Sequence, residues 1–157
     1  MDQEYTEWEI NRMKEKYYEI NNSIRTYNTK VNSNNEEISR LNKRLNELIV
    51  IKKNLKRSDE KFDRYLNTKK RKFEILRSSY YNTKFARDCS EEILDFINGR
   101  ETLSARNSIE SAINEVQRKF NKLSLDIEEL KKNNNTLKNR IYDLEYERKL
   151  ILQKGVI

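Results

Sequence analysis

The sequence has no proline and no histidine, and it contains two glycines and one cysteine among 157 residues. Globular domains use about 5% proline and about 7% glycine to build their turns, so a fold of many short strands and loops is excluded. Without histidine, and with Cys89 alone, the chain has no ligand set for a zinc site and no His-based catalytic triad. A single cysteine forms no internal disulfide, which fits a reducing compartment. The composition therefore predicts a non-enzymatic chain without a metal or another cofactor.

Long hydrophobic runs are missing as well. The longest, Leu48-Ile49-Val50-Ile51, is too short to span a membrane. The first residues have no apolar segment of the kind found in secretory signal peptides. We therefore expect a cytoplasmic protein without a signal peptide or a membrane span, and co-export with a partner stays open.

Charge and a regular apolar pattern are what the sequence has in quantity. Charged residues make up 38% of the chain and hydrophobic residues 35%. With Ile10 at heptad position a, a seam runs without a slip to Thr83, and 17 of its 22 a and d positions are apolar. Such a sustained period of 3.5 residues is typical of a coiled coil. The a positions are Ile10, Tyr17, Ile24, Val31, Ile38, Leu45, Lys52, Asp59, Leu66, Phe73 and Tyr80, and the d positions are Met13, Ile20, Tyr27, Asn34, Leu41, Leu48, Leu55, Phe62, Lys69, Leu76 and Thr83.

A second seam runs from Ile109 to Ile151, with 11 apolar residues in 13 positions. The 26 residues from Thr83 to Ile109 are not a multiple of seven, so the two seams are out of phase and the helix must break between them. The second seam consists of Ile109, Ile113, Val116, Phe120, Leu123, Ile127, Leu130, Asn134, Leu137, Ile141, Leu144, Arg148 and Ile151.

The break is predicted at Asn98-Gly99. We expect the left-handed conformation that ends a helix at Gly99, and Thr102 as the N-cap of the next helix. The chain is then all-α, a single elongated antiparallel helical hairpin or coiled coil. Its first helix is expected over residues 4–97, the turn over 98–102 and the second helix over 103–154.

A second candidate break lies at residues 32–35. Ser33 and Glu36 have the spacing of a capping box there, and the run of asparagines is poor helix material. The heptad phase passes through this segment unchanged, and Asn34 fits a polar seam residue that fixes the register. Continuity of the first helix is therefore favoured over a break.

Folding at Asn98-Gly99 makes the numbers of facing seam residues add up to 196 or 203, and the second value sets Asn134 opposite Lys69. In either register the C-terminal end of the second helix lies opposite residues 45–52 of the first helix. The seam residues before that point therefore have no partner within the chain. Exposed apolar stripes of this size mark interfaces. We therefore predict a partner-binding surface made of Ile10, Met13, Tyr17, Ile20, Ile24, Tyr27, Val31, Ile38 and Leu41.

Two alternatives cover the same seam differently. A break at residues 32–35 would let the first helix fold back into a self-contained three-helix bundle. Two copies could also pair their overhanging seams and form a homodimer.

Charge is concentrated in one segment. Residues 52–72 contain 10 Lys and Arg against 3 Asp and Glu, which accounts for the whole net charge of +7. Such a cluster suits nucleic acid, an anionic surface or an acidic partner, and no nucleic-acid-binding motif accompanies it, so nucleic acid is the least favoured. Three aromatic residues off the seam, Trp8, Tyr142 and Tyr146, suggest a second contact face.

The stretch FARDCSEEILDFINGRETLSARNSIESAI reads as a helix, a Gly-marked turn and an amphipathic helix. Over residues 60–155 the chain thereby resembles the small helical proteins encoded beside LXG-domain toxins of the Gram-positive type VII secretion system, which are similar to the WXG-type hairpin family. The resemblance implies a coiled-coil adaptor or targeting chaperone that binds the helical N-terminal domain of the toxin, often with a second small helical protein. A homo-oligomeric coiled-coil scaffold is the alternative, with a basic coiled-coil nucleic-acid binder as the third reading.

Overall fold

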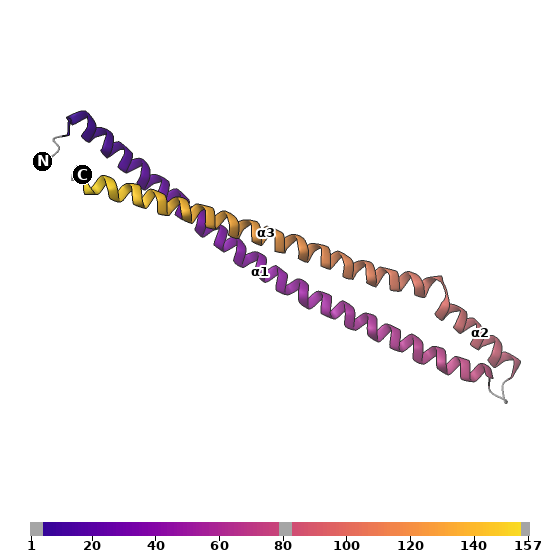
Figure 1. The fold of residues 1–157 in the computed structure, drawn as a ribbon. Helices are drawn as coiled ribbons and strands as arrows, with labels where there is room; N and C mark the ends of the chain where they lie inside the picture. Colours follow the sequence, from indigo (N-terminus) through magenta and orange to yellow (C-terminus); the bar gives the residue numbers. More distant parts are fainter. Residues whose placement is uncertain (1–4, 79–82, 155–157) are drawn as a thin grey trace. The chain divides into compact units, whose positions relative to one another are not determined.

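The computed structural model describes residues 5–78 and 83–154, and these form three helices without a strand (Figure 1). The helices are α1 (Glu7–Ser78), α2 (Lys84–Asn98) and α3 (Arg100–Gln153). The all-α helical hairpin expected from the heptads is confirmed. The contacts divide the chain into unit 1, which is Met1–Lys43 with Leu123–Ile157, and unit 2, which is Arg44–Lys122.

The start of α1 is fixed by a capping box. The backbone N–H and the hydroxyl of Thr6 both donate to Glu9 Oε2 at 2.8 Å, and the Glu9 N–H donates back to Thr6 Oγ1 at 3.3 Å. Two N–H donors that have no partner within the helix, those of Thr6 and Glu9, are thereby satisfied. The hydrogen bonds from the Thr6 backbone and side chain lower the pKa of the Glu9 carboxyl below its usual value.

The helix α1 runs unbroken through residues 32–35, so the favoured continuity is confirmed and the three-helix alternative is wrong. In unit 1, Asn34 Nδ2 donates to Asn134 Oδ1 at 2.8 Å, and Asn134 Nδ2 donates to Asn35 Oδ1 at 2.8 Å. Asn134 is buried and Asn34 is half-buried. The asparagines therefore do not end the helix: they satisfy one another across the seam.

The hydrogen bond between Asn34 and Asn134 gives the register of unit 1. Facing residue numbers add up to 168 there, and Arg148 Nη1, which donates to Asn21 Oδ1 at 3.1 Å, agrees with this register to within one residue. The predicted values of 196 and 203 are wrong, and Asn134 does not face Lys69. The part of α3 from Leu123 onward consequently packs along the N-terminal seam.

The N-terminal seam is closed within unit 1, so the prediction that it faces water without an internal partner is wrong. Ile20, 4% exposed, forms a core with Ile24 and Ile151, against which Met13, Tyr17, Ile141 and Leu144 pack. The nine predicted partner-binding residues are all covered to some degree. Ile20, Ile24, Val31 and Leu41 are buried, and Ile10, Met13, Tyr17, Tyr27 and Ile38 are half-buried.

Unit 2 pairs the second half of α1 with the first part of α3 in a similar register. Arg106 Nη2 lies 2.6 Å from Asp63 Oδ1, and Lys52 Nζ donates to Gln117 Oε1. The facing numbers add up to 169 in both pairs. The core of this unit is thin, because Leu66 and Leu94 are its only buried hydrophobic residues among those described.

The helix α1 ends at Ser78, so the expectation of one helix to residue 97 is wrong. The sequence from Ser78 to Thr83 is rich in serine, tyrosine and asparagine, which favour helices weakly. Thr83 then acts as the N-cap of α2, since its hydroxyl accepts from the Ala86 N–H at 3.3 Å. The chain reverses direction between Ser78 and Lys84 (Figure 1), well before Gly99. The seam residue Tyr80 lies outside the described residues.

The predicted break at Asn98-Gly99 exists, but it joins α2 to α3 and is not the reversal of the hairpin. Gly99 has φ −81° and ψ −177°, an extended conformation, so the expected left-handed conformation is wrong. Its N–H donates to Phe96 O at 3.1 Å. Thr102 is the third residue of α3 and its buried hydroxyl donates to the same Phe96 carbonyl at 3.1 Å, so it closes the junction and is not an N-cap.

Replacing Gly99 by alanine should destabilise this junction. A Cβ atom at residue 99 would lie 2.6 Å from the Asp95 carbonyl oxygen and 3.3 Å from that of Phe96, so the backbone must shift. We expect Gly99→Ala to lower the free energy of unfolding by about 1–3 kcal/mol in urea titrations. The exposed Asn107→Ala provides the control, and equal stability of the two variants would contradict the close approach at Gly99.

Candidate protein-interaction surfaces

Unit 2 exposes more large hydrophobic side chains than it buries, as far as its described residues go. Among the described residues the numbers are ten exposed against two buried in unit 2, and seven against six in unit 1, although apolar side chains are stabilised by leaving water. The exposed residues are Ile49, Val50, Ile51, Tyr65, Ile75, Leu76, Phe85, Ile93, Phe96 and Leu103.

One turn of α1 in unit 2 is apolar around its whole circumference. Leu48 occupies a seam position and is half-buried, whereas Ile49, Val50 and Ile51 are 52%, 57% and 46% exposed. A helix that is apolar on all sides is normally buried on all sides. Pairing with α3 covers the Leu48 side alone, so this turn offers apolar surface in several directions.

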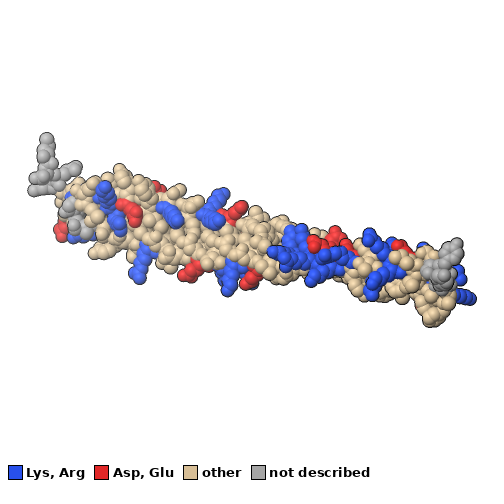
Figure 2. All heavy atoms as spheres, turned by 90° about the horizontal axis from the view of Figure 1, so that it is seen from below, with Lys and Arg blue, Asp and Glu red and all other residues tan. Residues whose placement is uncertain are grey.

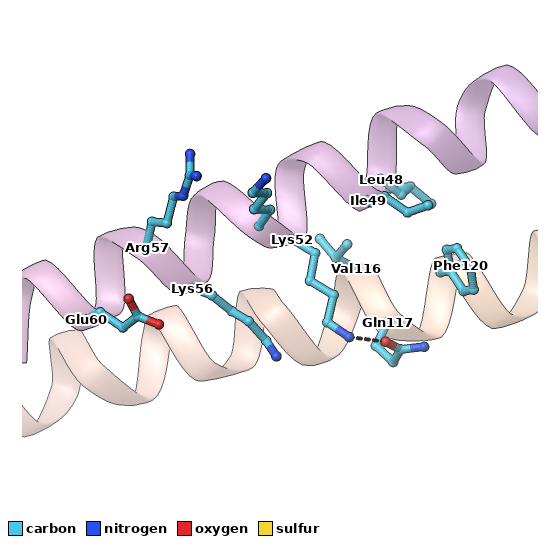
Figure 3. A pocket seen from close by; sticks show the side chains of 10 residues that line it. Leu48, Ile49, Lys52, Lys56, Arg57, Glu60, Val116, Gln117 and Phe120 are labelled. Carbon is cyan, nitrogen blue, oxygen red and sulfur yellow. Dashed lines mark hydrogen bonds between the residues drawn. The ribbon is translucent and has the colours of Figure 1, made fainter.

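A groove of about 530 Å³ lies beside this turn, between α1 and α3 of unit 2 (Figure 3). Its apolar part is made by Leu48 and Ile49 of α1, with Val116 and Phe120 projecting from α3 toward α1. The groove exists because the seam position after Leu48 is a lysine. Lys52 reaches across to Gln117 of α3 to hydrogen-bond, so no apolar side chain fills the space between the helices.

The groove has a basic rim. Its lining residues include four cationic side chains and one acidic side chain. These are Lys52, Lys53, Lys56 and Arg57, and Glu60. In Figure 3, Lys56 extends toward α3 and Arg57 points away from it. The whole of unit 2 carries 19 Lys and Arg against 12 Asp and Glu, and unit 1 is balanced. Figure 2 shows the Lys and Arg side chains gathered on the drawn face of unit 2.

The helix α2 carries an apolar stripe on its outer side. Phe85 is 77% exposed, Ile93 and Phe96 are exposed, and Cys89 between them is half-buried. Their spacing of four, four and three residues keeps them on one side of the helix. The opposite packing side, with Ser90 and Leu94, is buried.

Acidic residues flank the apolar stripe of α2. Asp88, Glu92 and Asp95 are exposed and lie next to the stripe at helical spacing. The basic residues of this helix, Lys84 and Arg87, lie farther from it around the helix. The outer side of α2 is therefore an acidic amphipathic surface.

The aromatic residues predicted as a second contact face are exposed and belong to unit 1. Tyr142 and Tyr146 lie on α3, and Trp8 lies on α1 with the Arg12 guanidinium 5.3 Å from its ring centroid. Among the described residues no ring contact joins Trp8 to either tyrosine. Their contact role stays a prediction.

The groove and the α2 stripe were missed by reasoning from the sequence, although both left a signal. The run from Leu48 to Ile51 places apolar residues at heptad positions d, e, f and g, of which only d belongs to the seam. The densest cluster of cations starts directly after it. Phe85, Cys89, Ile93 and Phe96 follow a helical period, but under a single first helix they only extend its seam.

No family model matches the chain, and no curated protein and no solved structure does either. Among residues 5–78 and 83–154 there is no group of three or more Cys, Asp or Glu placed to hold a metal ion. Within the same residues, no helix combines the length and the apolar character needed to cross a membrane.

Proposed function

We propose that the chain is a non-enzymatic coiled-coil adaptor that binds a helical domain of another protein. The observation that carries this proposal is the excess of exposed over buried hydrophobic side chains in the described part of unit 2. A helical hairpin that only had to be stable and soluble would gain from polar residues at these positions.

The partner we propose is the helical N-terminal domain of a type VII-secreted LXG toxin, for which the chain would act as targeting chaperone. The resemblance of residues 60–155 to the small helical proteins encoded beside such toxins supports this choice. The exposed apolar residues of unit 2 lie largely in the same residue range.

The contact surface we assign to this partner is the side of α1 that carries Ile51 and Tyr65. These residues occupy the same heptad position, g, two heptads apart, and both are exposed. Aliphatic and aromatic side chains at such spacing are the anchors of helix-against-helix recognition. The basic groove opens beside heptad position e on the opposite side of the seam, so the two surfaces are separate.

The test is co-expression of the chain with the LXG-domain segment encoded by a neighbouring gene, followed by affinity measurement. We expect Ile51→Glu/Tyr65→Glu to weaken the complex at least about tenfold, since each substitution places a charge where an apolar side chain is to be buried. Asn46→Glu/Asn67→Glu adds the same charges at exposed positions of α1 on the other side of the helix and should bind like the unmodified chain. Equal binding by both variants, or no complex at all, would refute the proposal.

A further inference from the structure

We propose that two copies of this chain associate reciprocally, with the acidic apolar stripe of α2 from each copy seated on the basic groove of the other. This goes beyond the proposed adaptor function, because it assigns a homodimer interface to residues that the partner surface around Ile51 and Tyr65 does not use.

The apolar parts of the two surfaces are complementary. The groove presents Leu48, Ile49, Val116 and Phe120 within a volume of about 530 Å³, the size of a pocket that takes ring-sized groups. The stripe presents Phe85 and Phe96, which are well exposed and stand three helical turns apart. Seating these rings in the groove removes apolar surface of both copies from water.

The charges are complementary as well. Lys53, Lys56 and Arg57 of the groove are exposed and make no ion pair that the structure describes. The α2 residues Asp88, Glu92 and Asp95 carry three negative charges on one flank of the stripe. Matching a positive rim to a negative flank sets the orientation of α2 and disfavours other placements.

The groove cannot be filled by α2 of its own chain. Lys70 of α1 donates to Asn98 at the end of α2 at 3.3 Å, and Leu94 of α2 is buried in unit 2. Arg57 lies 13 residues before Lys70 on the same helix, a distance of about 20 Å at 1.5 Å per residue. A second copy supplies the missing α2.

Both surfaces belong to unit 2, so two copies related by a two-fold axis form two identical contacts. Doubling the contact raises the buried area toward that of a specific interface. A nucleic acid would use the cations of the groove but not its apolar part, which is why we place a protein helix there.

The experiment is sedimentation velocity on the full chain, with two charge-reversed variants. One is Lys53→Glu/Lys56→Glu/Arg57→Glu, which makes the groove acidic, and the other is Asp88→Lys/Glu92→Lys/Asp95→Lys, which makes the stripe basic. We expect the unmodified chain to form dimers between about 1 and 100 µM, and each variant alone to associate at least about tenfold more weakly.

Mixing the two variants should restore the dimer. In the mixed pair the acidic groove meets the basic stripe, and the unmodified stripe of one copy meets the unmodified groove of the other, so both contacts are complementary. Arg71→Glu/Lys72→Glu, outside the groove, should dimerise like the unmodified chain, and circular dichroism should give equal helicity for all variants.

A monomeric unmodified chain, dimers that persist in either variant, or a mixture that stays monomeric would each overturn the inference. If the unmodified chain is monomeric but binds a duplex DNA probe through the groove cations, the groove is a nucleic-acid site and the inference is likewise overturned. Binding of the LXG domain is measured separately with the Ile51→Glu/Tyr65→Glu variant, so failure of the dimer and failure of the adaptor function are distinguishable.

Discussion

Substituting Ile24→Asp and Val31→Asp should open unit 1 in the isolated chain. Both side chains are buried where α1 packs against α3 in unit 1. None of the ion pairs described lies at either position, so a new aspartate there would be buried without a cationic partner. Removing a buried aliphatic side chain costs about 2–5 kcal/mol, and an unpaired buried carboxylate costs more. Two such changes exceed what a unit with six buried hydrophobic residues among those described can tolerate. Hydrogen exchange of the amides in residues 7–43 should become fast.

The matched control is Thr26→Asp/Ser33→Asp, which places the same charges on the same helix at exposed positions. This variant should keep the exchange protection of the unmodified chain. Protection that survives in Ile24→Asp/Val31→Asp would mean that the N-terminal seam is not covered by its own chain. The partner-binding hypothesis for Ile10 to Leu41 would then regain its basis.

The two seams could be predicted from the sequence almost residue by residue. Every seam position from Ile10 to Phe73 is buried or half-buried, and so is every position from Ile109 to Ile151. At the end of the first predicted seam, Leu76 and Thr83 are exposed, so the seam stops short of Thr83. The polar residues within the seams also follow the rule that buried polar groups find partners, as in Asn34 with Asn134 and Lys52 with Gln117. Heptad periodicity is strong because it sums weak preferences over many turns.

The register could not be predicted from periodicity alone. Antiparallel pairing of these two seams is equally in phase whenever facing numbers add up to 168, 175, 182, 189, 196 or 203, because each heptad repeats the pattern. The prediction placed the turn of the hairpin at Gly99 because glycine is the strongest helix breaker in this part of the sequence, and this choice favours the sums of 196 and 203. The cost of leaving nine seam residues in water favours the smaller sum, which the structure adopts in both units.

The prediction of a left-handed conformation at Gly99 is wrong for a physical reason. A glycine after a helix usually provides positive φ, but Gly99 is required because a Cβ atom would meet the Asp95 carbonyl in an extended conformation. The sequence shows that a glycine is present at this position. It does not show whether a positive φ or a close backbone contact requires it. The reversal instead falls at a segment without glycine or proline, between Ser78 and Lys84.

The asparagine pair at the centre of unit 1 should set the register at the expense of stability. Asn134→Leu alone leaves Asn34 half-buried without its acceptor, and we expect the free energy of unfolding to fall by about 1–2 kcal/mol. In Asn34→Leu/Asn134→Leu the two positions become an ordinary apolar contact, and the free energy of unfolding should rise above that of the unmodified chain by about 1 kcal/mol. Urea titrations of both variants check this change of sign.

The gain in stability should come with a loss of uniqueness. Without the hydrogen bonds from Asn34 and Asn134, a shift of α3 by one heptad costs little, since apolar residues still face apolar residues. Spin labels at the exposed residues Asn28 and Asn139, whose numbers add up to 167, should give one short distance in the unmodified chain. In the double variant we expect a second population in which the two labels are offset by about 10 Å along the helix axis, one heptad at 1.5 Å per residue, and are therefore farther apart. A single unchanged distance would mean that the remaining seam, and not the asparagines, fixes the register of unit 1.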